Sequence, residues 1–241
     1  MAGITANLTD FKELNENIRQ TDDKCVIIDN CIGQRFIADG LSDKKIIING
    51  VPGNALGAYL NGAEIEVFGN VQEATGDTMN DGVITVHGNA GDATGYAMRG
   101  GKIFIEKNAG YRAGIHMKAY KEKFPALIIG GEAGSFLGEY QAGGVIVVLG
   151  LYTSGKPPVG YFCGTGMHGG KIFLRTESIP HDLPAQVSSK KAEKEDLEEI
   201  KDYIKEFCEK FSKDEEEILS GTFYVLTPNT NNPYKQLYTS N

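Results

Sequence analysis

Two glycine-rich segments of the 241-residue chain match, in letters, loops that bind nucleotide phosphates. Gly164-Thr-Gly-Met-His-Gly169 satisfies GxGxxG, and Gly150-Leu-Tyr-Thr-Ser-Gly-Lys156 matches a Walker A loop up to its lysine. Such loops work because they open a helix whose backbone amides face the phosphates. Here residues 171–174 continue the first segment as a strand, and Pro157 and Pro158 follow the second without offering a hydroxyl to magnesium. We therefore expect neither segment to bind a nucleotide.

The remaining residues that could act as nucleophiles, bases or metal ligands are scattered. The chain has four histidines and four cysteines: His87, His116, His168, His181, Cys25, Cys31, Cys163 and Cys208. They form no CxxC pair, and the sequence contains no GxSxG motif. Outward carboxylates such as Glu64, Glu66 and Glu106 do not form one acidic column of the kind used for sugar chemistry. The sequence predicts no catalytic, cofactor-binding or metal site, and it predicts free thiols in a reducing compartment.

The charge pattern argues against nucleic acid and membrane partners. The net charge is −8, and residues 190–217 carry seven lysines against twelve acidic residues. No basic patch is present to neutralise phosphates, so DNA and RNA binding are not expected. No apolar stretch approaches about 18 residues, the length that a membrane span requires. We expect a cytoplasmic protein.

Glycine is the compositional outlier and recurs with a period of 19 residues, most plainly in three segments that begin at Asn70, Asn89 and Asn108. The chain has 31 glycines, whereas a share of about 7% is usual. Insertions near residues 120–125 and 155–159 lengthen two of the repeats, as loops on one edge of a repeat protein do. We assign a structural role, as tight corners that need positive φ, to six coil glycines: Gly57, Gly76, Gly95, Gly114, Gly138 and Gly164.

Each repeat ends in a short run of alternating aliphatic residues, such as Ile65/Val67, Ile84/Val86 and Ile103/Ile105. A period of two is typical of a strand with one face buried. No helical period appears between these strands. The pattern predicts an all-β core, a single-stranded right-handed parallel β-helix built from coils of about 19 residues, with short helical flanks at both ends.

Two kinds of residue column follow from stacking the repeats. Methionine recurs at one inward position as a core ladder of Met79, Met98, Met117 and Met167. The outward middle position of the strands changes from polar Glu66 and Thr85 to an apolar stripe made of Phe104, Ile128, Val147 and Phe173. An exposed apolar stripe should be covered. We treat it as a candidate interface, and we expect the C-terminal tail of the chain, ahead of a partner subunit, to cover most of it.

The flanks break the repeat and divide the chain into three predicted parts. Residues 1–45 form an N-terminal helix and strand cap, residues 46–178 the β-helix, and residues 179–241 a helical tail that packs on it. Thr9 or Asp10 can cap the first helix. In the tail, Leu197, Ile200, Ile204, Phe207, Cys208 and Phe211 share one face of an amphipathic helix, and a second short helix runs from Asp214 to Ser220.

The glycine coils, of which residues 88–101 are an example, resemble the GXGXG domain that ends the large (alpha) subunit of glutamate synthase. Related domains occur in a subunit of formylmethanofuran dehydrogenase. The resemblance also includes residues 14–19 near the start, residues 214–223, and the ending 233–238, which is similar to the tail of free-standing glutamate synthase domain proteins. It implies a separated, structural piece of a larger enzyme.

In that family, one domain hydrolyses glutamine with an N-terminal cysteine and another reduces the imine of 2-oxoglutarate on FMN beside an iron–sulfur cluster. This chain begins Met1-Ala2 and has no cysteine triplet suited to a cluster, so no catalytic residue is carried over. The resemblance implies a non-catalytic docking subunit for amidotransferase-like and FMN-dependent partners, which would hold the FMN and the cluster. The alternatives are a subunit of an N-methylglutamate synthase-like or formylmethanofuran dehydrogenase-like complex, or an independent self-associating scaffold that forms homo-oligomers.

Overall fold

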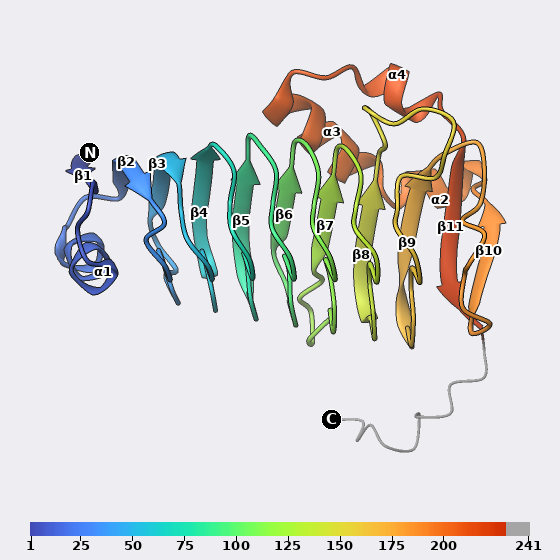
Figure 1. Cartoon of the computed structure of the whole chain (residues 1–241), viewed down its shortest axis with the longest axis horizontal. Helices are drawn as coiled ribbons and strands as arrows, with labels where there is room; N and C mark the ends of the chain where they lie inside the picture. The colour runs from blue at the N-terminus through green and yellow to red at the C-terminus, as the bar shows by residue number, and fades with distance from the viewer. Residues whose placement is uncertain (230–241) are drawn as a thin grey trace.

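The alternating aliphatic runs of the sequence form the strands of one large sheet, which Figure 1 shows along its length. The computed structural model describes residues 1–229, so the segment 233–238 lies outside the described residues. The strands are β1 (Ala2–Thr5), β2 (Cys25–Ile32), β3 (Lys45–Val51), β4 (Asn61–Phe68), β5 (Asp81–Val86), β6 (Lys102–Ile105), β7 (Ala126–Ile129), β8 (Ala142–Val148), β9 (Gly169–Arg175), β10 (Val187–Lys191) and β11 (Phe223–Pro228). The helices are α1 (Phe11–Gln20), α2 (Lys194–Glu198), α3 (Lys201–Phe211) and α4 (Glu215–Leu219).

Strands β1 to β9 pair in parallel and in sequence order, and β11 and β10 then complete the 11-stranded sheet in antiparallel pairing. The predicted register is confirmed, because equivalent residues of successive repeats lie side by side: Ile65, Ile84, Ile103, Leu127, Ile146 and Ile172. All six are buried in one shared core with the four methionines of the predicted ladder. The parallel ladder begins at β1, ahead of residue 46.

A second ladder holds the coils together on another side. Small residues pair in parallel from coil to coil at Val71, Ala90, Ala109, Ala133 and Val159. Next to this column, the side chain of each asparagine accepts a hydrogen bond from the following coil. The N–H of Asn89 donates to Oδ1 of Asn70 at 2.8 Å, and the N–H of Asn108 donates to Oδ1 of Asn89 at 3.2 Å. These side chains fix each coil on its neighbour.

The glycine corners form a third ladder of six-residue turns, which we call the corner segments: residues 54–59, 73–78, 92–97, 111–116, 135–140 and 161–166. The second, fourth and sixth residues of a segment have positive φ, as Ala74 (58°), Gly76 (71°) and Thr78 (51°) illustrate. Residues with positive φ alternate with residues in ordinary conformations. This alternation turns successive peptide groups toward opposite neighbours.

The hydrogen bonds of segment 73–78 show why the alternation is needed. The N–H groups of Ala74 and Thr78 donate to carbonyls of the following coil at 2.8 and 2.7 Å, whereas the N–H of Gly76 donates to Leu56 of the preceding coil at 2.8 Å. The same directions recur in the other segments. Backbone groups at a buried turn must find partners, and here the partners are the coils above and below.

The fourth residue of a segment points its Cβ position into the core. A Cβ at Gly76 would lie 2.4 Å from Cδ1 of Ile103, and one at Gly114 would lie 2.5 Å from Cδ1 of Ile146. The predicted coil glycines all occupy this position, with φ between 64° and 73°. The third residue also faces the core, as Leu56, Leu137 and Cys163 show. The second and sixth residues point outward instead, and they carry alanine, threonine, tyrosine, phenylalanine, arginine or histidine, with glycine at Gly166.

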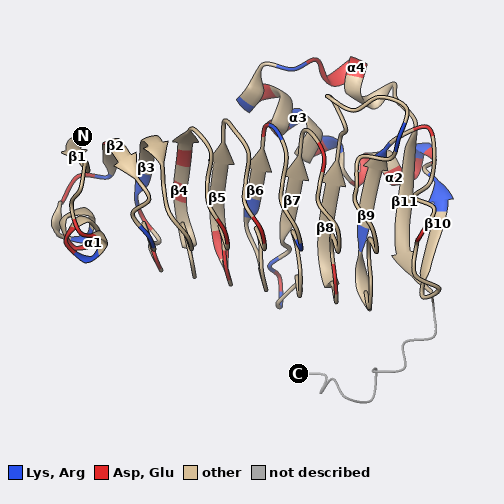
Figure 2. Ribbon diagram, viewed as in Figure 1, with Lys and Arg blue, Asp and Glu red and all other residues tan. Residues whose placement is uncertain are grey.

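The apolar stripe lies beneath the C-terminal part of the chain. Its four residues adjoin in register and are fully buried: Phe104, Ile128, Val147 and Phe173. They form one apolar cluster with residues of α3 and β11, namely Ile204, Phe207, Phe211, Phe223 and Val225. Figure 2 shows basic residues next to Asp and Glu on these tail helices, and the sequence identifies the basic residues as lysines. The stripe is therefore covered within this chain.

The flanks agree with the sequence in the caps of α1 and α4, and differ from it in one tail helix and in three strands. Asp10 caps α1 by accepting from the N–H of Lys12, and Asp214 caps α4 by accepting from the N–H of Glu217, as predicted. The single tail helix predicted over 197–211 is instead two helices. Ile200 leaves helical geometry with φ −110° and ψ −4°, and its N–H bonds three residues back to Leu197. Strands β1, β10 and β11 were not predicted.

The corner geometry predicts that alanine substitutions at two coil glycines differ in cost. Gly76→Ala should lower the free energy of unfolding by about 2–4 kcal/mol, because strain at positive φ adds to overpacking against Ile103. Gly95→Ala should cost only about 1 kcal/mol, since its Cβ would meet nothing nearer than 3.7 Å. Chemical denaturation of both variants measures the difference.

A second substitution isolates the steric part of this cost. Ile103→Val removes the Cδ1 atom that a Cβ at Gly76 would meet. In that background Gly76→Ala should cost about as much as Gly95→Ala does, and a double-mutant cycle gives the coupling. Equal costs of Gly76→Ala in both backgrounds would contradict the packing explanation.

Candidate functional site

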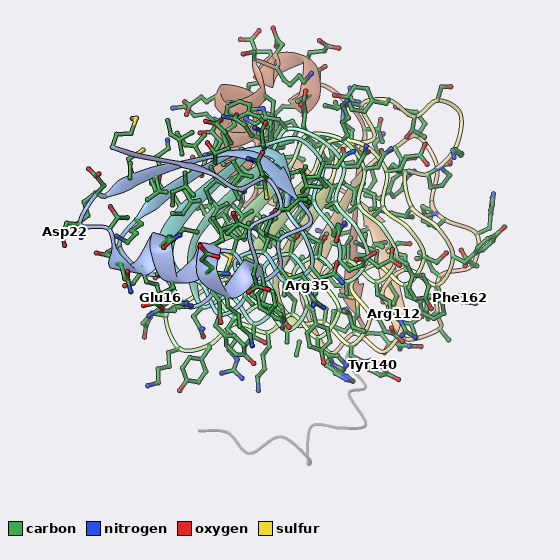
Figure 3. All side chains as sticks on the ribbon, turned by 60° about the vertical axis from the view of Figure 1, so that its left-hand side comes forward. Glu16, Asp22, Arg35, Arg112, Tyr140 and Phe162 are labelled. Atoms are coloured by element: carbon green, nitrogen blue, oxygen red, sulfur yellow. The ribbon has the colours of Figure 1, made fainter. Side chains whose placement is uncertain are left out.

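The outward positions of the last corner segments gather large side chains on one exposed face, which we call the aromatic corner. It consists of Tyr96, Tyr111, Arg112, His116, Phe136, Tyr140, Tyr161 and Phe162. Figure 3 shows Arg112, Tyr140 and Phe162 on the same side of the molecule. Tyr140 is 42% exposed and Tyr161 is 69% exposed. The rings therefore contact one another while much of their surface remains in solvent.

One row of the aromatic corner is made by rings at the first and second positions of the last three segments. The ring centroids of Tyr111 and Phe136 are 5.4 Å apart, and those of Phe136 and Phe162 are 5.0 Å apart. The guanidinium carbon of Arg112 lies 4.9 Å from the centroid of Tyr111 and 5.5 Å from that of Phe136. This is the distance range of cation–π contacts, so the arginine is held over the row.

A second row consists of Tyr96 at a fifth position, His116 and Tyr140 at sixth positions, and His168 just after the last segment. The ring of His116 stacks on Tyr140 at 5.2 Å with an interplanar angle of 11°, and meets Tyr96 edge-on at 5.9 Å. The ring centroids of Tyr140 and His168 are 6.3 Å apart. Burial, followed by the nearby His116, holds the pKa of His168 below its usual value. The row thus combines two tyrosines with two imidazoles, one of which resists protonation.

An ion pair lies beneath the two rows and joins adjacent coils. Oε2 of Glu139 is 2.8 Å from Nε of Arg112, and the Glu139 side chain is buried. The N–H of His116 also donates to the Glu139 carbonyl at 2.9 Å. A buried carboxylate needs a charged partner because its desolvation is costly, and the Arg112 guanidinium supplies that charge. Glu139 therefore fixes the position of Arg112 relative to the rings.

The backbone under the aromatic corner is in a conformation that large side chains rarely adopt. The φ angles are 57° at Arg112, 60° at Phe136, 54° at Tyr140 and 59° at Phe162. Positive φ costs a non-glycine residue about 1–2 kcal/mol. The equivalent residues of segments 73–78 and 92–97 are alanine or threonine. Large, half-exposed rings at strained positions do not serve the packing of the core, which points to a role in binding.

The chemistry of this face suits docking. Tyrosine, phenylalanine and arginine are enriched at the centres of protein interfaces, where they bury large area at low entropic cost. The rows lie on a rigid ladder of hydrogen-bonded coils, so the rings are already positioned before a partner arrives. The aromatic corner is the candidate functional site.

Sequence reasoning missed this surface. It treated His116 and His168 as scattered, because they occupy different repeat positions, yet the structure places both next to Tyr140. The available signal was the pair of columns two residues before and after each coil glycine. Between residues 74 and 162 those columns change from alanine and threonine to arginine, histidine and aromatic residues, although Tyr59 before them and Gly166 after them depart from this trend. Their outward direction was not evident without the corner geometry.

The other nucleophiles and bases lie apart from the aromatic corner. Burial raises the pKa of Cys31 to about 11, of Cys163 to about 12 and of Cys208 to about 11, so these thiols are protonated at neutral pH. Nε2 of His87 is 3.1 Å from Glu66, and the ring stacks on Phe68 under the end of α3. Within residues 1–229 no three acidic, histidine or cysteine side chains are grouped to hold a metal ion.

The two segments that match phosphate-binding loops in sequence, 164–169 and 150–156, have structural roles. In the GxGxxG segment, Gly164 is a coil glycine, a Cβ at Gly166 would lie 2.5 Å from the ring of Tyr140, and a Cβ at Gly169 would meet the carbonyl of Ala142 at 2.6 Å. The segment leads into β9. Glycine is needed at these positions because the Tyr140 ring and the backbone of β8 pack closely against them.

The Gly150–Lys156 segment lines an open hollow of about 360 Å³ together with Arg175. Both cations already have partners. Lys156 is 3.1 Å from Glu132, and Nε of Arg175 donates to the Ile218 carbonyl at 3.1 Å. The next element after the segment is the strand β9, not a helix. Across residues 1–229, no helix has the length and apolar character to cross a membrane.

Comparisons with known proteins match the whole extent of the coils. The profile of the GXGXG motif family matches residues 6–228. The uncharacterized protein MJ1350 of Methanocaldococcus jannaschii is 46% identical over 249 residues, which cover 98% of this chain and 95% of that protein. A similar fold occurs in the formyltransferase/hydrolase complex of Methylorubrum extorquens, solved with methylofuran, with a TM-score of 0.58 and 18% identity over 84% of this chain and 72% of that one.

The strained corner predicts that an aromatic residue there adds little to stability. Phe162→Gly should change the free energy of unfolding by less than about 1 kcal/mol, because relief of positive φ offsets the lost ring contacts. Phe104→Ala, at a fully buried ring, should cost about 3–5 kcal/mol. Denaturant titration compares the two, and similar costs would show that Phe162 is a packing residue.

The lowered pKa of His168 predicts a pH effect on stability. The unfolded chain binds a proton at His168 more readily than the folded one, so stability is full above the unfolded value of about 6.5 and falls as pH drops through the folded value. We expect His168→Gln to flatten the fall of the thermal midpoint over this range. The exposed His181→Gln variant is the control, and an unchanged slope in His168→Gln would refute the assignment.

Proposed function

Because the chain belongs to the GXGXG motif family, we propose that it is a non-catalytic subunit that docks the catalytic subunits of a larger complex through its aromatic corner. The observation that carries this proposal is the set of exposed rings at strained positions, which the fold itself does not need. The similar fold in a multi-subunit complex supports a role among partner subunits.

We infer that the complex is of the glutamate synthase type. The partners would be an amidotransferase-like subunit that releases ammonia from glutamine and a flavoprotein that uses it on 2-oxoglutarate. FMN and an iron–sulfur cluster would reside on those partners, and this chain would hold them together and limit the escape of ammonia. The support is the sequence of the coils and of residues 214–223, which resembles free-standing domains of that enzyme.

A second candidate is a subunit of a formyltransferase-type or N-methylglutamate synthase-type complex. The fold likeness to the formyltransferase/hydrolase complex favours the first of these. Both candidates use the same architecture, which we take to be a right-handed parallel β-helix, since crossover connections between parallel strands are almost always right-handed. The candidates differ in the partners, not in the role of this chain.

Affinity purification of the full chain from the organism that encodes it tests the proposal. Recovery of a glutaminase-like protein together with a flavin-containing protein, identified by mass spectrometry and flavin absorbance, is expected. Recovery of a formyltransferase-like protein would select the second candidate. A chain that is purified without any stoichiometric partner would argue against docking of either kind.

Substitutions in the aromatic corner locate the docking surface. The double variant Tyr140→Ala/Phe162→Ala should weaken partner binding at least tenfold, about 1.4 kcal/mol or more, because it removes two interface rings. Tyr152→Ala removes a similarly exposed ring outside the aromatic corner and is the control. Equal retention of the partner by both variants would place docking elsewhere on the molecule.

A further inference from the structure

The two edges of the 11-stranded sheet differ in how they are protected. The edge strand β10 ends in Lys190 and Lys191, and Figure 2 shows basic colour on it. Lysines on an edge strand discourage pairing with another chain. The edge strand at the other end is β1, with the sequence Ala-Gly-Ile-Thr. It carries neither a charged residue nor a proline.

The backbone of β1 presents unused hydrogen-bonding groups along this edge. The N–H of Ala6 donates to the Asp29 carbonyl of the neighbouring chain segment at 2.8 Å. Backbone groups alternate in direction along a strand, so Ala2 and Ile4 also face β2, whereas Gly3 and Thr5 face away from the sheet. Gly3 and Thr5 are both exposed. The N–H and C=O groups of these two residues are therefore free to pair with a further strand.

The helix at this end leaves the strand edge open. Figure 1 shows α1 below β1 in the view and not beside it. Leu14 and Ile18 of α1 are buried in the core of the coils. Large apolar side chains remain exposed near the edge, with Leu8 91% and Ile32 64% accessible. Two charged side chains near the edge are paired within the chain, Asp23 with the terminal amine of Met1 and Lys24 with Asp43.

We propose that β1 pairs antiparallel with β1 of a second copy of this chain, so that two sheets join end to end about a two-fold axis. The strand is self-complementary in the register that sets Ile4 opposite Ile4 of the second copy. Gly3 of each copy then lies opposite Thr5 of the other, and these outward-facing pairs exchange four N–H···O=C bonds. An isologous contact of this kind needs no other partner, because the same four residues supply both sides.

The joined edge is distinct from the aromatic corner. The aromatic corner lies on the turns of the later coils, and β1 is the first strand, so both can be occupied at once. The dimer therefore brings two docking surfaces into one assembly and doubles the number of partner sites. Each end of the resulting rod is then an edge protected by Lys190 and Lys191.

The test compares three purified full-length proteins by sedimentation and light scattering over a range of concentrations. The wild-type chain is expected at twice the 26.1 kDa mass of one chain. Gly3→Pro removes one outward N–H without touching a bond to β2, since proline is accepted on an edge strand, and it should be monomeric. Gly3→Ala keeps the N–H, and its Cβ meets no atom within 4 Å, so it should remain dimeric.

Amide hydrogen exchange gives an independent reading at the edge. The Thr5 amide should exchange slowly in the dimer and should speed up on dilution or in Gly3→Pro. If Gly3→Pro fails to fold, Gly3→Lys/Thr5→Lys sets like charges opposite each other across the two copies and should separate them. A monomeric wild-type chain overturns the proposal and would leave the edge available to a strand of another protein. A dimer that persists in both sets of variants while the Thr5 amide exchanges rapidly also overturns it.

Discussion

The fold depends on hydrogen bonding between corners of successive coils. A corner must reverse the chain and still leave every backbone group paired with the coil above or below, because these groups are withdrawn from water. Positive φ at every second residue of a corner segment satisfies both demands, as the bonds of Ala74, Gly76 and Thr78 show. The strand ladder and the small-residue ladder then follow the same 19-residue step.

This constraint separates the residues that maintain the fold from those free to serve binding. The fourth position of a segment faces the isoleucines of the core, so glycine is needed there. The second and sixth positions share its backbone strain but face solvent. Evolution can place any side chain on them at a modest cost, and in residues 111–162 they carry arginine, histidine and aromatic rings. The function is therefore carried by the outward columns.

The tail resolves the conflict between a long apolar sheet and water. Phe104 and its neighbours in the stripe would expose a continuous apolar surface, and α3 and β11 bury it with Phe207 and Val225 among others. β11 also pairs antiparallel with β9 and so ends the parallel ladder. Much of this was readable in the sequence, because the period of the glycines, the alternating aliphatic pairs and the amphipathic face of residues 197–211 are local patterns.

The sequence by itself determined the repeat, the all-β core, the coil glycines and the composition of each column, since these are local patterns that recur at a fixed interval along the chain. Only the tertiary structure decided which columns face outward and which side chains meet across coils. His116, Tyr140 and His168 belong to three successive coils, and Arg112 and Glu139 are 27 positions apart in the sequence. Stacking of the coils brings the members of each set into contact. The physical reason is that the stacked backbone sets the direction of a side chain at positive φ and the partner that it meets one coil away. Neither property leaves a periodic pattern in the residue types.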